Sequence, residues 1–322
     1  MWVARATVGG MLAITVTTET GPPRARITAD DLAALVRRIG GAGDTFLIAE
    51  RLPDQPDVYV QVLRTTAGDY QLEHRDGAPE RHYQVMLDGP EPVIAAMTGW
   101  ARRREGWDAG LAWERLDLGP AVAESSDADP DLPPGLDEDE WQELTEHVGT
   151  LLAGGYATRA ELAEAAEEYL ATDDERPLSP AQAWQLADRL WRERLAEQAG
   201  WEGETDPERL ARAFEALRKA GITAEENFTC CRTCGQAEIG AAGSPDARGF
   251  VYFHSQCTDS AVAGNGLTLL YGGFDGSAET TRAIGHEVAA VLREHGLPVE
   301  WSGDPERAIT LTPLAWCRRL VG

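Results

Sequence analysis

The sequence predicts an α+β protein of two domains, and three observations lead to this prediction. The chain has 322 residues, enough for two domains of ordinary size. Hydrophobic residues make up 43% of it, which is enough to build their cores. Short alternating apolar runs, typical of strands, lie toward both ends of the chain, whereas helical periodicity dominates the middle.

A small α+β meander domain is predicted for residues 1–119. Thr28 has the position of an N-cap and Gly40 that of a helix stop, so we expect a helix between them. Strand-like runs with turn residues between them precede and follow this helix, and a second helix comes after them. The predicted strands are residues 11–17, 45–51, 58–65, 69–76, 82–88 and 113–119, and the second helix is 91–103.

Residues 120–136 have the composition of a linker, because they are rich in Pro, Ser and Asp and lack apolar periodicity. The C-terminal domain is predicted for residues 137–322 and begins with an acidic helical segment. Helix starts are marked by Thr158 with Glu161 three residues later, and by Ser179 followed by Pro180. The predicted helices are residues 137–155, 158–173, 179–200 and 206–221.

An α/β sheet layer is predicted after Gly221, where strand-like runs replace the helical pattern. One long amphipathic helix interrupts these runs and ends at Gly296. The predicted strands are residues 227–230, 250–255, 267–273, 297–303 and 308–314, and the helix is 277–296.

The charge of the chain is strongly negative and unevenly placed. There are 54 acidic and 29 basic residues, and residues 121–228 alone hold 27 acidic and 9 basic ones. Phosphates and anionic lipids need a basic surface, so we expect neither direct nucleic-acid binding nor membrane attachment. No run approaches the ~20 apolar residues of a membrane span, and the N-terminus lacks the features of a signal peptide, whether the chain starts at Met1 or Met11.

Four of the five cysteines lie within residues 230–257. An odd cysteine count with three in one tight turn suits a reducing cytoplasm, so we expect a cytoplasmic protein. Cys231 and Cys234 have the spacing of a zinc knuckle, and His254 and Cys257 repeat that spacing. Together these four residues could form a tetrahedral zinc site, with Cys230 as a spare thiol.

Two other interpretations of the cysteines stay open. They could pack as small hydrophobic side chains in a core. Cys231 and Cys234 could also form a thioredoxin-like redox pair, which requires a helix N-terminus after a strand and a lowered thiolate pKa. The sequence provides no catalytic constellation of the familiar kinds, so it predicts a protein that is not an enzyme and has no cofactor, with zinc as the alternative.

Two resemblances accompany these patterns. The run FTCCRTCGQAEIG with GFVYFHSQCTDSAVAGNGLTLLYGGF and VEWSGDPERAITL resembles an uncharacterised, mainly actinobacterial domain family whose hallmark is a CCxxCG turn, here Cys230 to Gly235. The resemblance covers about residues 140–320 and implies a domain boundary without an activity. Residues 11–119, with the run GDYQLEHRDGAPERHYQV, resemble small bacterial immunity-type domains, which implies binding to a partner protein.

The sequence therefore predicts a non-catalytic binding or regulatory protein, of the immunity or antitoxin kind, that binds a basic protein partner through its acidic surface. Opposite charges would steer such a partner toward the acidic helices. The alternative is a zinc-binding or thiol-redox protein centred on the CCxxCG cluster.

Overall fold

A computed structural model of the chain describes residues 10–41, 43–64, 68–116, 133, 136–172 and 176–320. These residues form two compact units, residues 10–116 (unit 1) and residues 133–320 (unit 2). Each unit combines helices with a sheet of its own, so the predicted α+β class is confirmed. Of the predicted linker, residues 120–136, only Pro133 and Leu136 are described, and the domain boundaries therefore stay a prediction.

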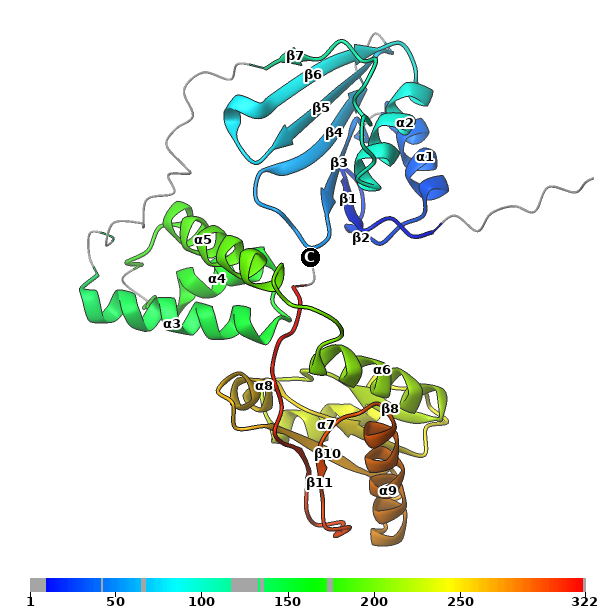
Figure 1. Cartoon of the computed structure of the whole chain (residues 1–322), viewed down its shortest axis with the longest axis vertical. Helices are drawn as coiled ribbons and strands as arrows, with labels where there is room; N and C mark the ends of the chain where they lie inside the picture. The colour runs from blue at the N-terminus through cyan, green and yellow to red at the C-terminus, as the bar shows by residue number, and fades with distance from the viewer. Residues whose placement is uncertain are drawn as a thin grey trace, which may run out of the picture. The chain divides into compact units, whose positions relative to one another are not determined.

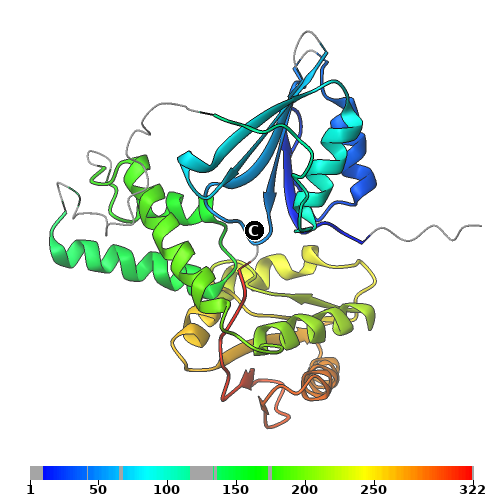
Figure 2. The same ribbon diagram turned by 45° about the horizontal axis from the view of Figure 1, so that its top comes forward.

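Unit 1 is an antiparallel sheet with two helices on one of its faces (Figures 1 and 2). The strands follow the spatial order β2-β1-β3-β4-β5-β6-β7, so most neighbours in the chain are also neighbours in the sheet. The strands are β1 (Ile14–Thr18), β2 (Arg24–Ala25), β3 (Phe46–Arg51), β4 (Val58–Arg64), β5 (Tyr70–Asp76), β6 (His82–Leu87) and β7 (Glu114–Arg115). The helices are α1 (Ala29–Arg38) and α2 (Pro90–Ala101), and a 3₁₀ turn, η1 (Pro79–Arg81), precedes β6.

Local sequence explains where α1 begins and which face it buries. Thr28 is the N-cap, and a reciprocal pair of hydrogen bonds joins it to Asp31, each 3.1 Å long from backbone nitrogen to side-chain oxygen. Leu32 and Val36 lie one turn apart on the helix and are fully buried in the core of unit 1. Each such side chain contributes about 1.5–3 kcal/mol by leaving water, which fixes the helix against the sheet.

Unit 2 begins with four helices, of which the first three share one core and the fourth packs against the sheet that follows. The first three begin with a capping box, in which the N-cap and the third helical residue exchange hydrogen bonds. At the fourth, the Thr205 backbone N–H donates to Glu208 over 2.8 Å. Trp191, fully buried, lies in the core of the first three. The helices are α3 (Glu138–Gly154), α4 (Arg159–Tyr169), α5 (Pro180–Gln198) and α6 (Asp206–Lys219). The predicted helical segment is therefore confirmed.

The rest of unit 2 is a five-stranded sheet in the order β11-β12-β10-β9-β8, in which β8 and β9 are parallel and the other pairs antiparallel. Alternate side chains of each strand face α6 and α9 on one side, and α7 on the other. The strands are β8 (Ile222–Glu225), β9 (Gly249–Tyr252), β10 (Leu267–Gly273), β11 (Val299–Glu300) and β12 (Ile309–Leu311). The helices are α7 (Arg232–Ala242), α8 (Ser255–Val262) and α9 (Ala278–Glu294).

Around the cysteines two details of the predicted layer were wrong. Residues 227–230 form a turn instead of a strand, because Asn227 and Thr229 have positive φ angles of 48° and 60°, which no strand allows. Strand β9 ends at Tyr252, and the predicted strand residues His254 and Ser255 are the N-cap and first residue of α8. Since His254 makes no capping hydrogen bond, the start of α8 carries no strong sequence signal.

Candidate metal centre

The cysteine-rich turn lies at the carboxyl end of the parallel strands β8 and β9. Glu225 at the end of β8 pairs with Tyr252 at the end of β9. From these two ends the chain turns into α7 and α8 respectively. The space outside the carboxyl ends of parallel strands, where helices begin, is a common ligand-binding position in open sheets. The fold thus places the cysteines at such a position.

Glu226 anchors the start of the turn to the helical part of unit 2. Its carboxylate accepts hydrogen bonds of 2.9 Å from Tyr156 Oη and from Arg318 Nη1. The Arg318 guanidinium also lies 3.8 Å from the centre of the Tyr156 ring. Burial, followed by the Glu226 charge, raises the pKa of Tyr156 far above its usual value. Glu226, the residue from which the turn begins, is therefore held in place and largely buried.

The backbone of the turn is strained and held in place by α8. A left-handed conformation costs an ordinary residue about 1–2 kcal/mol, and a β-branched residue such as Thr229 is an outlier there. The Thr229 carbonyl accepts a 3.1 Å bond from the Ser255 amide, and the Cys230 carbonyl a 3.1 Å bond from Ser255 Oγ. Thr258 Oγ1 donates to Asn227 Oδ1 over 2.7 Å. Strain that the surroundings maintain in this way is typical of functional sites.

The turn brings three thiols together at the start of α7. Cys231 is the N-cap of this helix, Cys234 is its third residue, and Cys230 precedes the cap. The three sulfur atoms all lie within 4.8 Å of one another, and those of Cys230 and Cys234 are 3.7 Å apart. Two sulfurs on one tetrahedral zinc are separated by about 3.8 Å, the edge that a Zn–S bond of about 2.3 Å implies. The cluster therefore has the dimensions of a zinc site.

The start of α7 favours a thiolate at Cys231. The backbone N–H of Cys234, followed by the side chains of Cys234 and Cys230, holds the pKa of Cys231 below its usual value, although no strict capping hydrogen bond is formed. Contact with Cys230 and then Cys231 raises the pKa of Cys234 to about 11, because neighbouring thiols and thiolates disfavour a second negative charge. A cation would relieve this repulsion.

The other two predicted ligands lie apart from this cluster. Cys257 Sγ lies 3.4 Å from His254 Nε2, and neither side chain joins the three sulfurs within 4.8 Å. Both are buried; Cys257 packs in the core of the sheet, and burial raises its pKa. Burial, followed by the charge of Arg232, lowers the pKa of His254. The structure thus brings Cys231 and Cys234 together with Cys230, and His254 with Cys257.

The four-ligand prediction from the sequence does not include Cys230, which it treats as a spare thiol. The sequence gives no reason to place the side chains of Cys230 and Cys231 on the same side of the chain, because adjacent side chains of an extended strand point to opposite faces. The left-handed Thr229 and the start of α7 remove that alternation. Across the described chain, Cys230, Cys231 and Cys234 form the one group of three or more histidine, cysteine or acidic side chains close enough to hold a metal ion.

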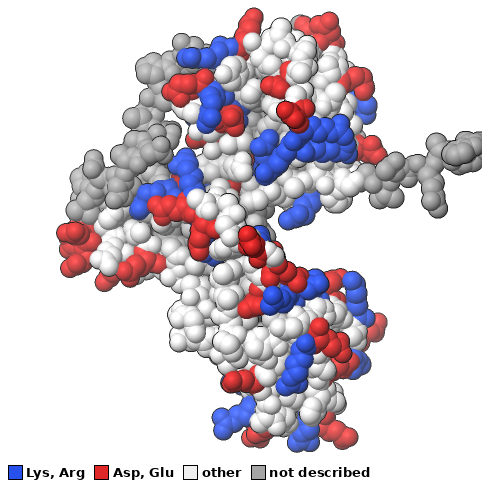
Figure 3. Space-filling view, viewed as in Figure 1, with Lys and Arg blue, Asp and Glu red and all other residues white. Residues whose placement is uncertain are grey.

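A second feature of unit 2 is the acidic surface of α3 and α4. It is formed by exposed carboxylates, and no lysine or arginine of the described residues lies within 4.0 Å of them. Red side chains gather over α3 at the left of Figure 3. We call this the acidic surface; its residues are Glu138, Asp139, Glu143, Glu146, Glu164 and Glu168.

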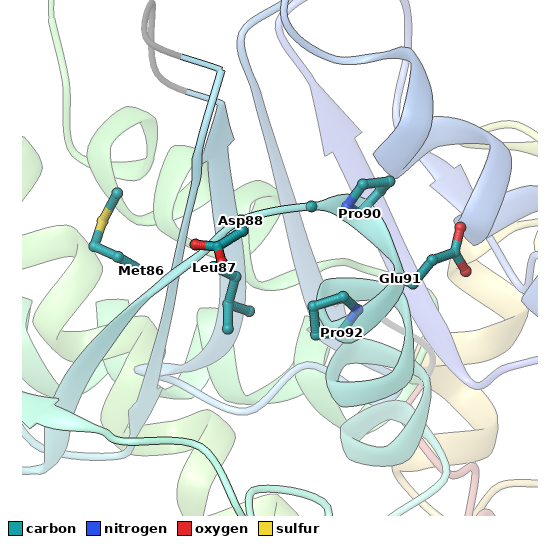
Figure 4. Close-up of a pocket in the computed structure, with 7 residues that line it drawn as sticks. Met86, Leu87, Asp88, Pro90, Glu91 and Pro92 are labelled. Carbon is teal, nitrogen blue, oxygen red and sulfur yellow. The ribbon is translucent and has the colours of Figure 1, made fainter.

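Unit 1 has a hollow where β6 leads into α2 (Figure 4). Its labelled side chains point in different directions: Met86 lies at one end of the view and Glu91 at the other. The side chain of Met86 is 54% exposed, and Glu91 is bonded to Arg37. This hollow therefore lacks the converging polar groups of a catalytic site.

Comparison with known proteins gives a family without an activity. Residues 137–320, more than half of the chain, match the profile of a family described as Domain of unknown function (DUF6891). This confirms an uncharacterised domain in the C-terminal part, whereas the actinobacterial origin and the immunity-type resemblance of residues 11–119 stay predictions. Curated proteins and solved structures gave no match. None of the helices in the described ranges is long and apolar enough to cross a membrane.

Proposed function

The chain belongs to the DUF6891 family, whose description assigns no activity, and we propose from its geometry that it binds one zinc ion through Cys230, Cys231 and Cys234. The observation that carries this proposal is the group of three sulfur atoms within 4.8 Å of one another. Thiolates are the ligands that zinc prefers, and the start of α7 already favours one of them. All five cysteines are free thiols, which supports a reducing compartment such as the cytoplasm.

Three protein ligands leave one position of a tetrahedral zinc ion open. Closed structural sites use four protein ligands, whereas sites that bind a further ligand keep a position for water. Cys230 is exposed, and Cys231 and Cys234 are half-buried, so the cluster borders solvent. We therefore propose that the zinc ion can bind an additional ligand at its fourth position, unlike a structural zinc site with four protein ligands.

Competition between the full chain and a chromophoric chelator tests this proposal. We expect one zinc per wild-type chain, and a loss of affinity of at least about 100-fold in Cys234→Ser, because a missing thiolate removes one of three ligands. Cys317→Ser is the matched control, since this thiol lies outside the cluster, and it should bind as the wild type does. Equal affinity in Cys234→Ser and Cys317→Ser would contradict the proposal.

The same titration separates the two possible ligand sets. If His254 and Cys257 complete the site, Cys257→Ser will weaken zinc binding as strongly as Cys234→Ser does. If the three clustered cysteines bind the ion, Cys257→Ser will leave the affinity within about threefold of wild type, because its sulfur is buried in the core.

Thiol–disulfide exchange is the competing function of the same cluster. The placement of Cys231 at the N-cap and Cys234 three residues later, after a strand, favours it, as does the lowered pKa of Cys231. A reversible Cys231–Cys234 disulfide would be detected as a loss of two thiols on equilibration with a dithiol redox buffer. Retention of both thiols at potentials above about −180 mV would exclude this function.

The acidic surface supports a second proposal, binding of a basic protein partner. Its carboxylates are exposed and not neutralised by basic side chains of the described residues. Such a surface accelerates association with a cationic partner and loses this effect as salt rises. The association rate of a lysine-rich peptide should therefore fall at least tenfold between 10 mM and 150 mM salt, on the order of effects seen in steered complexes. Glu143→Gln with Glu164→Gln removes two of the six carboxylates and should reduce this salt dependence. An association rate that does not change with salt, or a salt dependence equal in variant and wild type, would refute the proposal.

A further inference from the structure

A groove lies on the outer face of the sheet of unit 2, between α7 and the segment that precedes β12. α7 covers β8 and part of β9 on this face, where Gly235 lies against the Tyr252 ring. Phe250 of β9 and Leu270 of β10 form the floor of the groove. Its walls are formed by Arg232 and Gln236 on one side and by Glu306 and Arg307 on the other.

The floor of the groove is apolar. Phe250 is half-buried, and its cross-strand partner on β10 is Gly272. A Cβ atom at Gly272 would lie 2.9 Å from Phe250 Cζ, so the glycine leaves the space that this ring occupies. The ring also lies 5.3 Å from that of Phe274, which is 41% exposed. The floor therefore presents an aromatic surface to whatever enters the groove.

Among the described residues, the two arginines that flank this floor have no ionic partner. Most arginines of unit 2 reach a carboxylate within 4.0 Å, as Arg248 does with Glu287 and Arg318 with Glu226. Across the described residues no carboxylate lies within that distance of Arg232 or Arg307, and both side chains are exposed. Two unpaired guanidinium groups beside one groove favour an anion, because they form charge-assisted hydrogen bonds with it.

The backbones of both arginines are fixed by side chains of unit 2. Tyr252 Oη donates to the Arg232 carbonyl over 3.2 Å. The Arg307 carbonyl lies 2.9 Å from Tyr271 Oη and 3.2 Å from Trp301 Nε1. Since the backbone of both walls is held before any ligand arrives, binding has to order only the two arginine side chains.

We propose that this groove binds a small organic carboxylate whose body is apolar. Arg232 and Arg307 would bind the carboxylate, and Phe250 with Leu270 would contact the apolar body. Glu306 adds one negative charge to the wall, which disfavours ligands with several negative charges. Arg232 directly follows Cys231 in the chain, but none of the three thiols lines the groove, and the proposal does not depend on zinc binding.

The test uses 3-phenylpropionate as the probe, with the full chain and backbone amide NMR. We expect saturable shifts of the Phe250 and Leu270 amides, and at least about tenfold weaker binding of the neutral 3-phenylpropanamide, since this ligand has no negative charge to pair with the two guanidinium groups. Arg307→Gln should weaken phenylpropionate binding by a similar factor. Arg282→Gln, which changes an exposed arginine of α9 outside the groove, is the matched control and should bind as the wild type does.

Four results would overturn the proposal, three of which concern phenylpropionate itself. These three are the absence of saturable shifts at the floor residues, equal affinity for the acid and its amide, and equal weakening by Arg307→Gln and Arg282→Gln. Binding of inorganic phosphate as tight as that of phenylpropionate would also overturn it, because the apolar floor would then contribute nothing. A loss of binding in both Arg232→Gln and Arg307→Gln, with unchanged amide dispersion, would confirm that both guanidinium groups act on the ligand.

Discussion

The packing of α7 on the sheet gives a prediction that two glycines of one helix test against each other. Gly235 and Gly240 both lie in α7. A Cβ atom at Gly235 would lie 2.4 Å from Tyr252 Cε2 and 2.9 Å from its hydroxyl oxygen, whereas a Cβ atom at Gly240 meets nothing within 4 Å. Gly235→Ala should therefore overpack the interface, and Gly240→Ala should not.

The magnitude follows from two opposing effects. Replacing a helical glycine by alanine stabilises a helix by about 0.5–1 kcal/mol, and this gain is common to both variants. Overpacking a rigid contact costs about 1–3 kcal/mol, and Tyr252 cannot yield easily, because it is fully buried and its hydroxyl is bonded to the Arg232 carbonyl. We expect Gly240→Ala to be more stable than wild type, and Gly235→Ala to be less stable than Gly240→Ala by the overpacking cost alone.

Amide hydrogen exchange of the full chain measures this difference, with peptides from β9 and β10 reporting on unfolding of unit 2. Zinc affinity provides a second measurement, because a displaced α7 also displaces Cys231 and Cys234, so only Gly235→Ala should weaken binding. Equal exchange protection in the two variants would refute the packing of α7 on Tyr252. A destabilising Gly240→Ala would refute the helical, exposed environment of that residue.

Three further predictions concern the turn and its surroundings. Thr229→Gly should leave unit 2 at least as stable in urea, because it relieves about 1–2 kcal/mol of backbone strain, yet weaken zinc binding; unchanged affinity would show that the strain has no role at the metal. Burial raises the pKa of Tyr156, so unit 2 loses stability as pH rises above about 10. Tyr156→Phe should make the free energy of unfolding fall less steeply with pH above this value, by up to about 1.4 kcal/mol per pH unit. The same pH dependence in the variant and the wild type would contradict the burial of Tyr156. In the metal-free chain, mass spectrometry should show Cys231 alkylated at lower pH than Cys234, whose pKa is raised to about 11; the reverse order would contradict the helix effect.

The parts of the fold that local chemistry determines were predictable. Thr28, Thr158 and Ser179 all cap helices as their spacing to Asp31, Glu161 and Gln182 indicates, because capping depends on residues three apart in the chain. The meander of unit 1 and the helical segment of unit 2 follow from the same local patterns.

The helix that carries the thiols was not predictable in this way. Gly235 and Gly240 lower the helix propensity of residues 232–242, and the reason for Gly235 is its contact with Tyr252, seventeen residues away in the sequence. Likewise, the left-handed conformation of Thr229 is imposed by hydrogen bonds from α8, which no local pattern encodes. Cys231 and Cys234 were identified from their spacing, whereas the place of Cys230 beside them depended on these non-local contacts.

Binding of zinc by Cys230, Cys231 and Cys234 is tested most directly by X-ray absorption at the zinc edge of the zinc-loaded full chain. The structure predicts three sulfur atoms at about 2.3 Å and one oxygen at about 2.0–2.2 Å, without scattering from an imidazole ring. A shell of light atoms alone, or imidazole scattering from His254, would contradict the three-thiolate site.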